Sequence, residues 1–304
     1  MPSYRRVATL ENTNICNANC IFCGYQYQER ARGVQSWDSF IALARLLREH
    51  APALDIINFT PMVGDPLVDP KLLDKIVFCK QIGFRTILMT TNLIGLKSAA
   101  ALLRSGVDVI TISMPEPDAE SYGRIYRNPR FALFLKNLDE LTILNRQSAW
   151  PVRIALGLRG PKTRWELLRG SPLLRRIVGR LQFGLYDLSA ATSFDNWGGR
   201  ITAHDLLPGM TIRPNLPKSE PCYMLGFYGF TWDNRMMGCA CRDLDVSSDL
   251  DFGPATAEAI ESYHHPDAPL GRVKERWSKG QLPASCQDCR QYVPASSFFR
   301  AATR

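Results

Sequence analysis

Short apolar runs alternate with helical patterns from residue 6 to about residue 190, and this alternation constrains the fold more than any other feature. The runs cover 6–12, 54–60, 85–91, 107–113, 151–158 and 181–188, and amphipathic segments such as 36–50, 70–83 and 130–146 lie between them. Strands that alternate with helices are typical of βα units around a parallel sheet. The sequence therefore predicts an α/β fold, although period-2 counting alone does not distinguish six strands from eight.

Side-chain alternation predicts which residues face the interior of such a sheet. In 151–159, the apolar set packs on outer helices, which leaves Arg153, Ala155, Gly157 and Arg159 inward. By the same reasoning, polar residues lie inward near the carboxyl ends of the other strands, where βα proteins place active sites. These residues are Glu11, Asn58, Thr60, Thr90, Asn92, Thr111, Ser113 and Tyr186.

Three cysteines, Cys16, Cys20 and Cys23, follow directly after the first predicted strand. A structural zinc ion normally takes four protein ligands, whereas three thiolates can hold a 4Fe-4S cluster and leave one iron open to a small molecule. The spacing therefore favours a reactive cluster. The alternatives are a zinc loop completed by a distant ligand and three unrelated buried thiols.

This CxxxCxxC spacing, with Phe22 before the last cysteine, resembles the signature of the radical S-adenosylmethionine (SAM) superfamily. The resemblance implies that SAM binds the open iron and is cleaved to a 5'-deoxyadenosyl radical that abstracts hydrogen from a substrate. It further implies a partial (β/α)6 TIM barrel and an electron donor of the flavodoxin or ferredoxin type. The segment 63–66 (VGDP) resembles the family's glycine-rich GGEP turn, and TTN (90–92) and ISMPEP (112–117) resemble its polar strand ends. The SAM-binding residues implied are Phe22, Gly64, Asp65, Asn92, Ser113 and Glu116.

A second cysteine set lies near the C-terminus, at Cys222, Cys239, Cys241, Cys286 and Cys289. CxxC is a common local clamp for a metal, and four cysteines could hold either zinc or a 4Fe-4S cluster. Beside a radical SAM motif, the layout resembles the one-cluster twitch domain, which is half of the longer SPASM domain. That resemblance implies an auxiliary 4Fe-4S cluster on Cys222, Cys239, Cys286 and Cys289. Cys241 could replace Cys239, because the two lie on the same side of an extended strand.

Loss of periodicity predicts the domain limits. Residues 1–190 form the barrel, 191–220 a connecting segment rich in Pro, Gly, Asn and Asp, and 221–304 the auxiliary-cluster domain, with a hairpin that turns at Asp233-Asn234. Cys79 lies among apolar neighbours in the helical pattern 70–83 and is expected to be a small buried hydrophobe.

Charge and hydropathy exclude several classes of protein. The N-terminus has no apolar signal region and no run is long enough to span a membrane, so a cytoplasmic protein with reduced thiols is expected. The net charge of +8 is dispersed along the chain, which argues against a nucleic-acid partner. Because the barrel begins almost at residue 6, no peptide-recognition module is expected before it, and a small-molecule substrate is favoured.

The resemblance extends to 2-deoxy-scyllo-inosamine dehydrogenase and related radical SAM enzymes of aminoglycoside biosynthesis. It implies oxidation of a secondary alcohol of an aminocyclitol or aminoglycoside to a ketone, with the second cluster as electron acceptor. Arg153, with Tyr186 as the second choice, is predicted to orient the hydroxyl, and Glu11, Glu116 or Asp195 could meet a cationic amine. The alternatives are an epimerase in which Cys241 returns a hydrogen atom, a peptide maturase, and a non-enzymatic iron-sulfur or zinc module.

Overall fold

The computed structural model describes residues 6–149, 151–246 and 249–297. Its main feature is a nine-stranded sheet in the order β11-β10-β9-β1-β2-β3-β4-β5-β6, in which β1 to β6 run parallel. The six parallel strands are β1 (Val7–Leu10), β2 (Ile56–Phe59), β3 (Thr86–Thr91), β4 (Val109–Pro115), β5 (Arg153–Arg159) and β6 (Tyr186–Ala191). All six predicted strands are present, which confirms the partial-barrel prediction.

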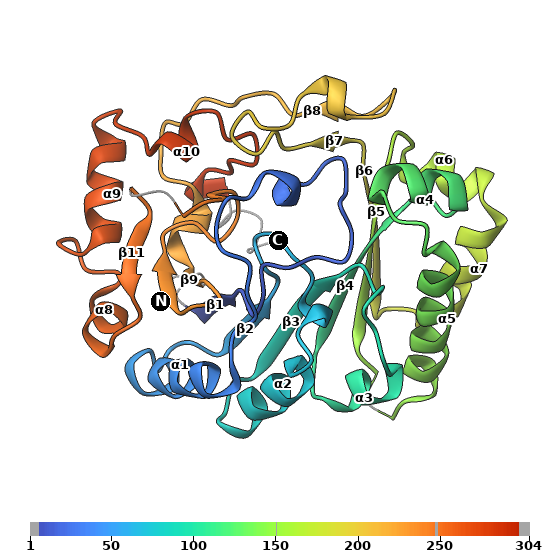
Figure 1. Cartoon of the computed structure of the whole chain (residues 1–304), viewed down its shortest axis with the longest axis horizontal. Coiled ribbons are helices and arrows are strands. Elements are labelled where there is room, and N and C mark those ends of the chain that lie inside the picture. Colours follow the sequence, from blue (N-terminus) through green and yellow to red (C-terminus); the bar gives the residue numbers. More distant parts are fainter. Residues whose placement is uncertain (1–5, 150, 247–248, 298–304) are drawn as a thin grey trace.

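Helices follow the strands around the outside of this sheet (Figure 1). They are α1 (Trp37–His50), α2 (Leu72–Gln81), α3 (Ala99–Arg104), α4 (Ala119–Tyr126), α5 (Phe131–Gln147), α6 (Arg164–Gly170) and α7 (Pro172–Arg180). Ser36 starts α1 as an N-cap, because its hydroxyl accepts a hydrogen bond from the backbone N–H of Ser39 at 3.2 Å. Gly83 follows α2 with a φ of +97°, the left-handed conformation that ends many helices. Within the described residues, no helix is long and apolar enough to cross a membrane.

The C-terminal segment extends the barrel sheet. β9 (Tyr228–Phe230) pairs parallel with β1, and β10 (Arg235–Met237) and β11 (Asp251–Pro254) continue antiparallel. β9 and β10 form the predicted hairpin, in which Asn234 adopts a φ of +63°. The remaining helices there are α8 (Ala257–Ser262), α9 (Pro269–Ser278) and α10 (Ala284–Gln287). The domain limits at 190 and 220 stay a prediction, since the sheet runs from the barrel into this segment.

The predicted connecting segment has structure of its own. β7 (Ser193–Phe194) and β8 (Thr211–Ile212) form a separate two-stranded sheet. Short 3-10 helices complete the secondary structure at η2 (Gly24–Tyr27), η3 (Pro66–Val68), η4 (Ala203–Asp205) and η5 (Tyr223–Gly226).

Burial alternates along the strands as the period of two requires. Ile110, Ile112, Ile154 and Leu156 are at most 1% exposed beneath the outer helices, whereas the inner-face residues between them are partly open. The prediction for Tyr186 was wrong. The register pairs Tyr186 with Ile154, so the tyrosine shares the helix-facing side, and Asp187, paired with Ala155, takes the inward position.

Candidate metal and cofactor site

The loop between β1 and α1 carries the first three cysteines and lies in the middle of the molecule, next to the C-terminal segment (Figure 1). Backbone bonds hold it to the chain that follows β4. The N–H of Asn19 donates to the carbonyl of Tyr126 at 3.1 Å, and the N–H of Ile21 donates to that of Ile125 at 2.9 Å. A loop at the carboxyl edge of parallel strands is the usual position for chemistry in βα proteins.

The three thiols gather in this loop. Burial raises the pKa of Cys16, Cys20 and Cys23, and the charges of the other two thiols raise the pKa of Cys20 further. Backbone N–H groups already point at two of the sulfurs, from Ala18 to Cys16 Sγ and from Tyr25 to Cys23 Sγ, each at 3.5 Å. In the described part of the chain, no three His, Cys, Asp or Glu side chains close on the position of a single ion. Three thiolates on one loop are the donor set that can hold a 4Fe-4S cluster and leave one iron open, so the chemistry of these residues fits a cluster.

The turn after β2 packs directly against the cysteine loop. Gly64 has a φ of +118°, and a Cβ there would lie 2.9 Å from the carbonyl oxygen of Thr13. The next N–H, of Asp65, donates to the carbonyl of Ile15 at 3.0 Å. Glycine is therefore required by both the backbone angle and the close approach.

Asp65 organises the end of β3. Its buried carboxylate accepts hydrogen bonds from the hydroxyl of Thr91 at 3.0 Å, from the N–H of Asn92 at 2.7 Å and from the N–H of Leu67 at 3.0 Å. Burial raises its pKa to about 6. Both carboxylate oxygens are thus engaged in holding the strand end, which makes Asp65 a positioning residue in this structure.

Asn92 reaches from that strand end to the cysteine loop. Its amide Nδ2 donates to Asn17 Oδ1 at 2.7 Å and lies 3.8 Å from Cys16 Sγ. Phe22, on the other side of the loop, stacks on Phe194 with the ring centroids 5.0 Å apart. Four of the predicted SAM-binding residues, Phe22, Gly64, Asp65 and Asn92, are therefore held in or against the cysteine loop.

Ser113 and Glu116 lie at and just beyond the end of β4. The Ser113 hydroxyl accepts a hydrogen bond from the phenol of Tyr126 at 3.0 Å. Glu116 is 2% exposed, and its Oε2 accepts a hydrogen bond from Lys162 Nζ at 2.6 Å, while its buried Oε1 has no hydrogen-bond partner among the residues that the structure describes. Glu116 therefore keeps acceptor capacity, which is unusual for a buried carboxylate.

The five C-terminal cysteines line one pocket. They reach it from η5, from the segment after β10 and from α10 with the residues that follow it, and they are Cys222, Cys239, Cys241, Cys286 and Cys289. Burial, followed by the charges of Cys289 and Cys222, raises the pKa of Cys286 to about 12. Five converging thiols match the donor set of a metal cluster better than that of an apolar core. Cys79, by contrast, is fully buried in the hydrophobic core, as expected.

The two predicted catalytic residues lie away from the cysteines. Arg153 is the first residue of β5, and its guanidinium forms an exposed ion pair with Asp187 at 2.8 Å. Six residues of strand, about 20 Å, separate it from the end of β5. Tyr186, opposite Ile154, lies at the same far end. The structure places neither Arg153 nor Tyr186 near the cysteine thiols.

Arg159 lies at the carboxyl end of β5, whereas Arg153 lies at the opposite end of the same strand. It closes β5 beside Pro115 of β4, and burial together with the charges of Arg213 and Arg242 lowers the pKa of its guanidinium. Within the described residues, its guanidinium donates one long side-chain hydrogen bond, 3.4 Å, to the carbonyl of Leu158. The alternation along β5 indicated that Arg159 faces inward, and its place at the carboxyl end was the signal that should have ranked it above Arg153.

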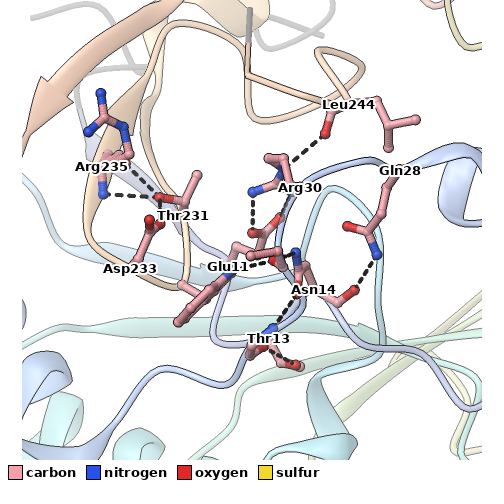
Figure 2. A network of polar contacts seen from close by, with 12 residues as sticks. Glu11, Thr13, Asn14, Gln28, Arg30, Thr231, Asp233, Arg235 and Leu244 are labelled. Carbon is pink, nitrogen blue, oxygen red and sulfur yellow. Dashed lines mark hydrogen bonds and ion pairs between the residues drawn. The ribbon is translucent and has the colours of Figure 1, made fainter.

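Two other candidate carboxylates are already paired. Arg30 forms a two-point ion pair with Glu11, with both N–O distances 2.8 Å, and its Nε donates to the carbonyl of Leu244 at 2.9 Å (Figure 2). Asp195 Oδ2 lies 2.8 Å from Arg242 Nε. Glu11 therefore links the first cysteine loop to the C-terminal segment, and Glu116 is the carboxylate of the three with a free oxygen.

Known proteins resemble this chain over its barrel in sequence and over most of its length in fold. The probable GTP 3',8-cyclase of Saccharolobus islandicus (strain Y.N.15.51 / Yellowstone #2) is 28% identical over 114 residues, 37% of this chain and 36% of that protein. The GTP 3',8-cyclase of Mycobacterium sp. (strain KMS) is 33% identical over 146 residues, 45% of this chain and 40% of that protein. The matched part is thus less than half the length of these curated relatives.

Solved structures show the fold similarity. BtrN in complex with AdoMet and 2-DOIA aligns with a TM-score of 0.59 at 13% identity, over 95% of this chain and 94% of that one. Streptococcus suis SuiB bound to precursor peptide SuiA aligns with a TM-score of 0.62 at 10% identity, over 98% and 73%. The model of the radical SAM superfamily matches residues 10–157. Residues 10–157, which include the loop with the three cysteines and run from the end of β1 into β5, therefore belong to the radical SAM superfamily.

Proposed function

We propose that this radical SAM enzyme oxidises a secondary alcohol of an aminocyclitol or aminoglycoside to a ketone, and that a second 4Fe-4S cluster accepts the electron. The observation that carries the proposal is the pocket lined by five cysteines, which adjoins the radical SAM site through Arg242. Oxidation of a substrate radical needs an electron acceptor nearby, and this pocket has the donor set to hold one. The fold similarity to BtrN, whose structure contains AdoMet and 2-DOIA, supports the choice of substrate class.

Cys16, Cys20 and Cys23 would hold the first cluster, with Asn92 and the Gly64 turn shaping the space beside it. When bound, this cluster and SAM supply a 5'-deoxyadenosyl radical that removes hydrogen from a carbon atom. Phe22 covers one side of the loop by stacking on Phe194. The chain's own contribution is to present three thiols on one loop and to fix that loop through Asn92 and the Gly64 turn.

Arg159 is the group best placed to orient the substrate or the SAM carboxylate from the end of β5. Its guanidinium keeps its charge, because arginine does not lose a proton in proteins, so it would stabilise a developing alkoxide by charge and hydrogen bonding. Arg153 remains a lesser candidate, since its ion pair with Asp187 holds it at the opposite end of β5. Glu116 Oε1 is available to accept a hydrogen bond from a substrate amine.

For the second cluster we propose Cys222, Cys239, Cys286 and Cys289 as ligands. Four thiolates close such a site, so the fifth cysteine leaves one thiol over. The thiol of Cys241 lies 3.5 Å from an Arg242 nitrogen. That surplus thiol favours a second candidate function, an epimerase in which Cys241 returns a hydrogen atom to the opposite face of the carbon.

One experiment separates the two reactions. The anaerobically reconstituted enzyme would be reduced and incubated with SAM and a panel of aminocyclitols and aminoglycosides in deuterated water, and product masses would be recorded after back-exchange. Loss of two hydrogens is the expected result and identifies a dehydrogenase. Gain of one non-exchangeable deuterium identifies an epimerase. Formation of 5'-deoxyadenosine only with a peptide would refute the substrate class, and its complete absence would refute the radical mechanism. A small flavodoxin or ferredoxin is proposed as the physiological electron donor and can replace the chemical reductant.

A further inference from the structure

Arg242 is a buried charge between the two cysteine sites. Its guanidinium NH1 donates to the carbonyl of Cys241 at 2.6 Å and lies 3.5 Å from that residue's Sγ. On its other side, the guanidinium carbon lies 4.2 Å from the ring centroid of Trp197. We propose that Arg242 is a positioning residue whose permanent positive charge makes the second cysteine site easier to reduce, and that Trp197 and Asp195 hold it there.

Trp197 connects this arginine to the first cysteine loop. Its indole Nε1 donates to the carbonyl of Phe22 at 3.0 Å, and its ring packs so closely on Gly24 that a Cβ there would lie 2.6 Å from it. Trp197 also adopts a φ of +51°, which is uncommon for a bulky residue and is maintained by the surrounding contacts. One ring therefore touches the residues on both sides of Cys23 and, on its face, Arg242.

Asp195 sets the position of the charge. Its Oδ2 lies 2.8 Å from Arg242 Nε and accepts a hydrogen bond from the N–H of Trp197 at 2.8 Å. Its Oδ1 accepts a hydrogen bond from the N–H of Arg290, the residue after Cys289, at 3.1 Å. The carboxylate is 4% exposed, so the ion pair is shielded from solvent. Arginine, tryptophan and aspartate are thus fixed to each other and to both cysteine segments.

Electrostatics give the sign of the effect. Reduction adds one negative charge to a cluster, and a positive charge that lines the same buried pocket, as Arg242 does, stabilises the added charge more strongly than it would in water. Arg242 therefore moves the reduction potential of the second site to a more positive value, and Asp195 offsets part of this. In the proposed reaction, the substrate radical passes one electron to this site and releases its hydroxyl proton, so a more positive potential favours ketone formation. The inference rests on the proposed second cluster.

The test is a potentiometric titration of the reconstituted holoenzyme, monitored by electron paramagnetic resonance, with neither SAM nor substrate present. The signal of the second cluster is identified as the one that persists in a Cys16→Ala, Cys20→Ala, Cys23→Ala variant. Arg242→Gln should make reduction of this cluster at least tenfold less favourable, a shift of about 59 mV to more negative potential. Arg242→Lys, which keeps the charge, should recover most of the shift.

Asp195→Asn should shift the same potential in the opposite direction, because it removes the negative partner and leaves the arginine. Arg235→Gln is the matched control, since it removes an arginine charge from the Asp251 ion pair outside both cysteine sites, and it should leave the potential unchanged. An Arg242→Gln potential equal to that of the control overturns the inference. If Arg242→Gln fails to assemble the second cluster, the Asp195→Asn titration decides, and a shift that is absent or negative overturns it. Failure of the dehydrogenase proposal would appear instead in the product masses, which this titration does not use.

Discussion

The two cysteine regions of this molecule are built in different ways. In the first, Cys16, Cys20 and Cys23 lie within one loop that follows β1, so a single segment provides all the thiols. In the second, five thiols converge from segments as far apart as residues 222 and 289. A local motif can form its geometry from spacing alone, whereas a dispersed one exists only after the surrounding chain has folded. We therefore expect that a cysteine substitution in the first region removes its chemistry only. A cysteine substitution in the second region should also affect the assembly of that region.

The first region still depends on long-range contacts for its orientation. Asn92 reaches it from β3, Gly64 and Asp65 from the turn after β2, and the backbone of Ile125 from the end of α4. Arg30 then ties the loop to Glu11 and to Leu244 in the C-terminal segment (Figure 2). The two regions are therefore adjacent parts of one structure.

The largest expected effect is the loss of SAM cleavage when a cysteine of the first region is replaced. Cys16→Ala should abolish reductive cleavage of SAM, because two remaining thiolates cannot hold a cluster with one open iron. The measurement is 5'-deoxyadenosine formed per enzyme under reducing conditions. Cys79→Ala is the control, since that thiol is buried in α2 away from either site and its loss should leave cleavage intact. Normal turnover by Cys16→Ala would remove the basis for assigning the cluster to this loop.

Substitution of two cysteines in the second region should remove only the iron that this region binds. Cys286→Ala combined with Cys289→Ala should reduce bound iron to about half if the two sites hold equal clusters. SAM cleavage should persist, while product oxidation should fail for lack of an electron acceptor. Iron analysis and the product assay on the same preparation check both parts. Unchanged iron together with bound zinc would contradict the second cluster and would make the two regions chemically different.

Sequence patterns predicted the barrel because its signals are local. Each of the six parallel strands overlaps an apolar run, α1 lies within the amphipathic segment 36–50, and the three-cysteine spacing lies in eight residues. Tyr186 was placed on the wrong face, because the strand begins at that residue and its register with Ile154 is set by pairing, which a single segment does not encode. A shift of one residue reverses every side chain of a strand.

The site residues that sequence reasoning missed depend on tertiary structure. Arg159 and Arg153 share one face of β5, and only the direction of the strand relative to the cysteine loop distinguishes their positions. Trp197 and Arg242 lie 45 residues apart and gave no motif at all. Their contact exists because the segment after β7 folds between the two cysteine regions. Contacts of this kind can be identified only when the order of the strands in the sheet is known.

A smaller effect should come from breaking the ion pair that joins the regions. Arg30→Met leaves the Glu11 carboxylate buried without its partner, which should lower the free energy of unfolding by about 3–5 kcal/mol. Urea denaturation measures this, and the double variant Glu11→Gln, Arg30→Met should lose less than the sum of the two single variants. Arg153→Met, which removes an exposed pair with Asp187, should change stability by about 1 kcal/mol or less. Equal losses for Arg30→Met and Arg153→Met would show that the buried pair does not couple the regions.

The smallest effect we predict concerns the turn that supports the first region. Gly64→Ala forces a side chain into a left-handed position, with its Cβ 2.9 Å from the Thr13 carbonyl, and should destabilise the protein by about 1–3 kcal/mol. Gly123→Ala is the matched control, because Gly123 lies inside α4 and, beyond its own helix backbone, no described atom lies within 4 Å of the added methyl; this variant should instead stabilise by up to about 1 kcal/mol. Because the atoms nearest to Gly64 belong to Thr13 and Asn14, just before the first cysteine loop, its variant should lower the iron held by the first region and leave the signal of the second cluster unchanged. Loss of both signals together would mean that the two regions assemble as a unit, and the local motif would then depend on the dispersed one.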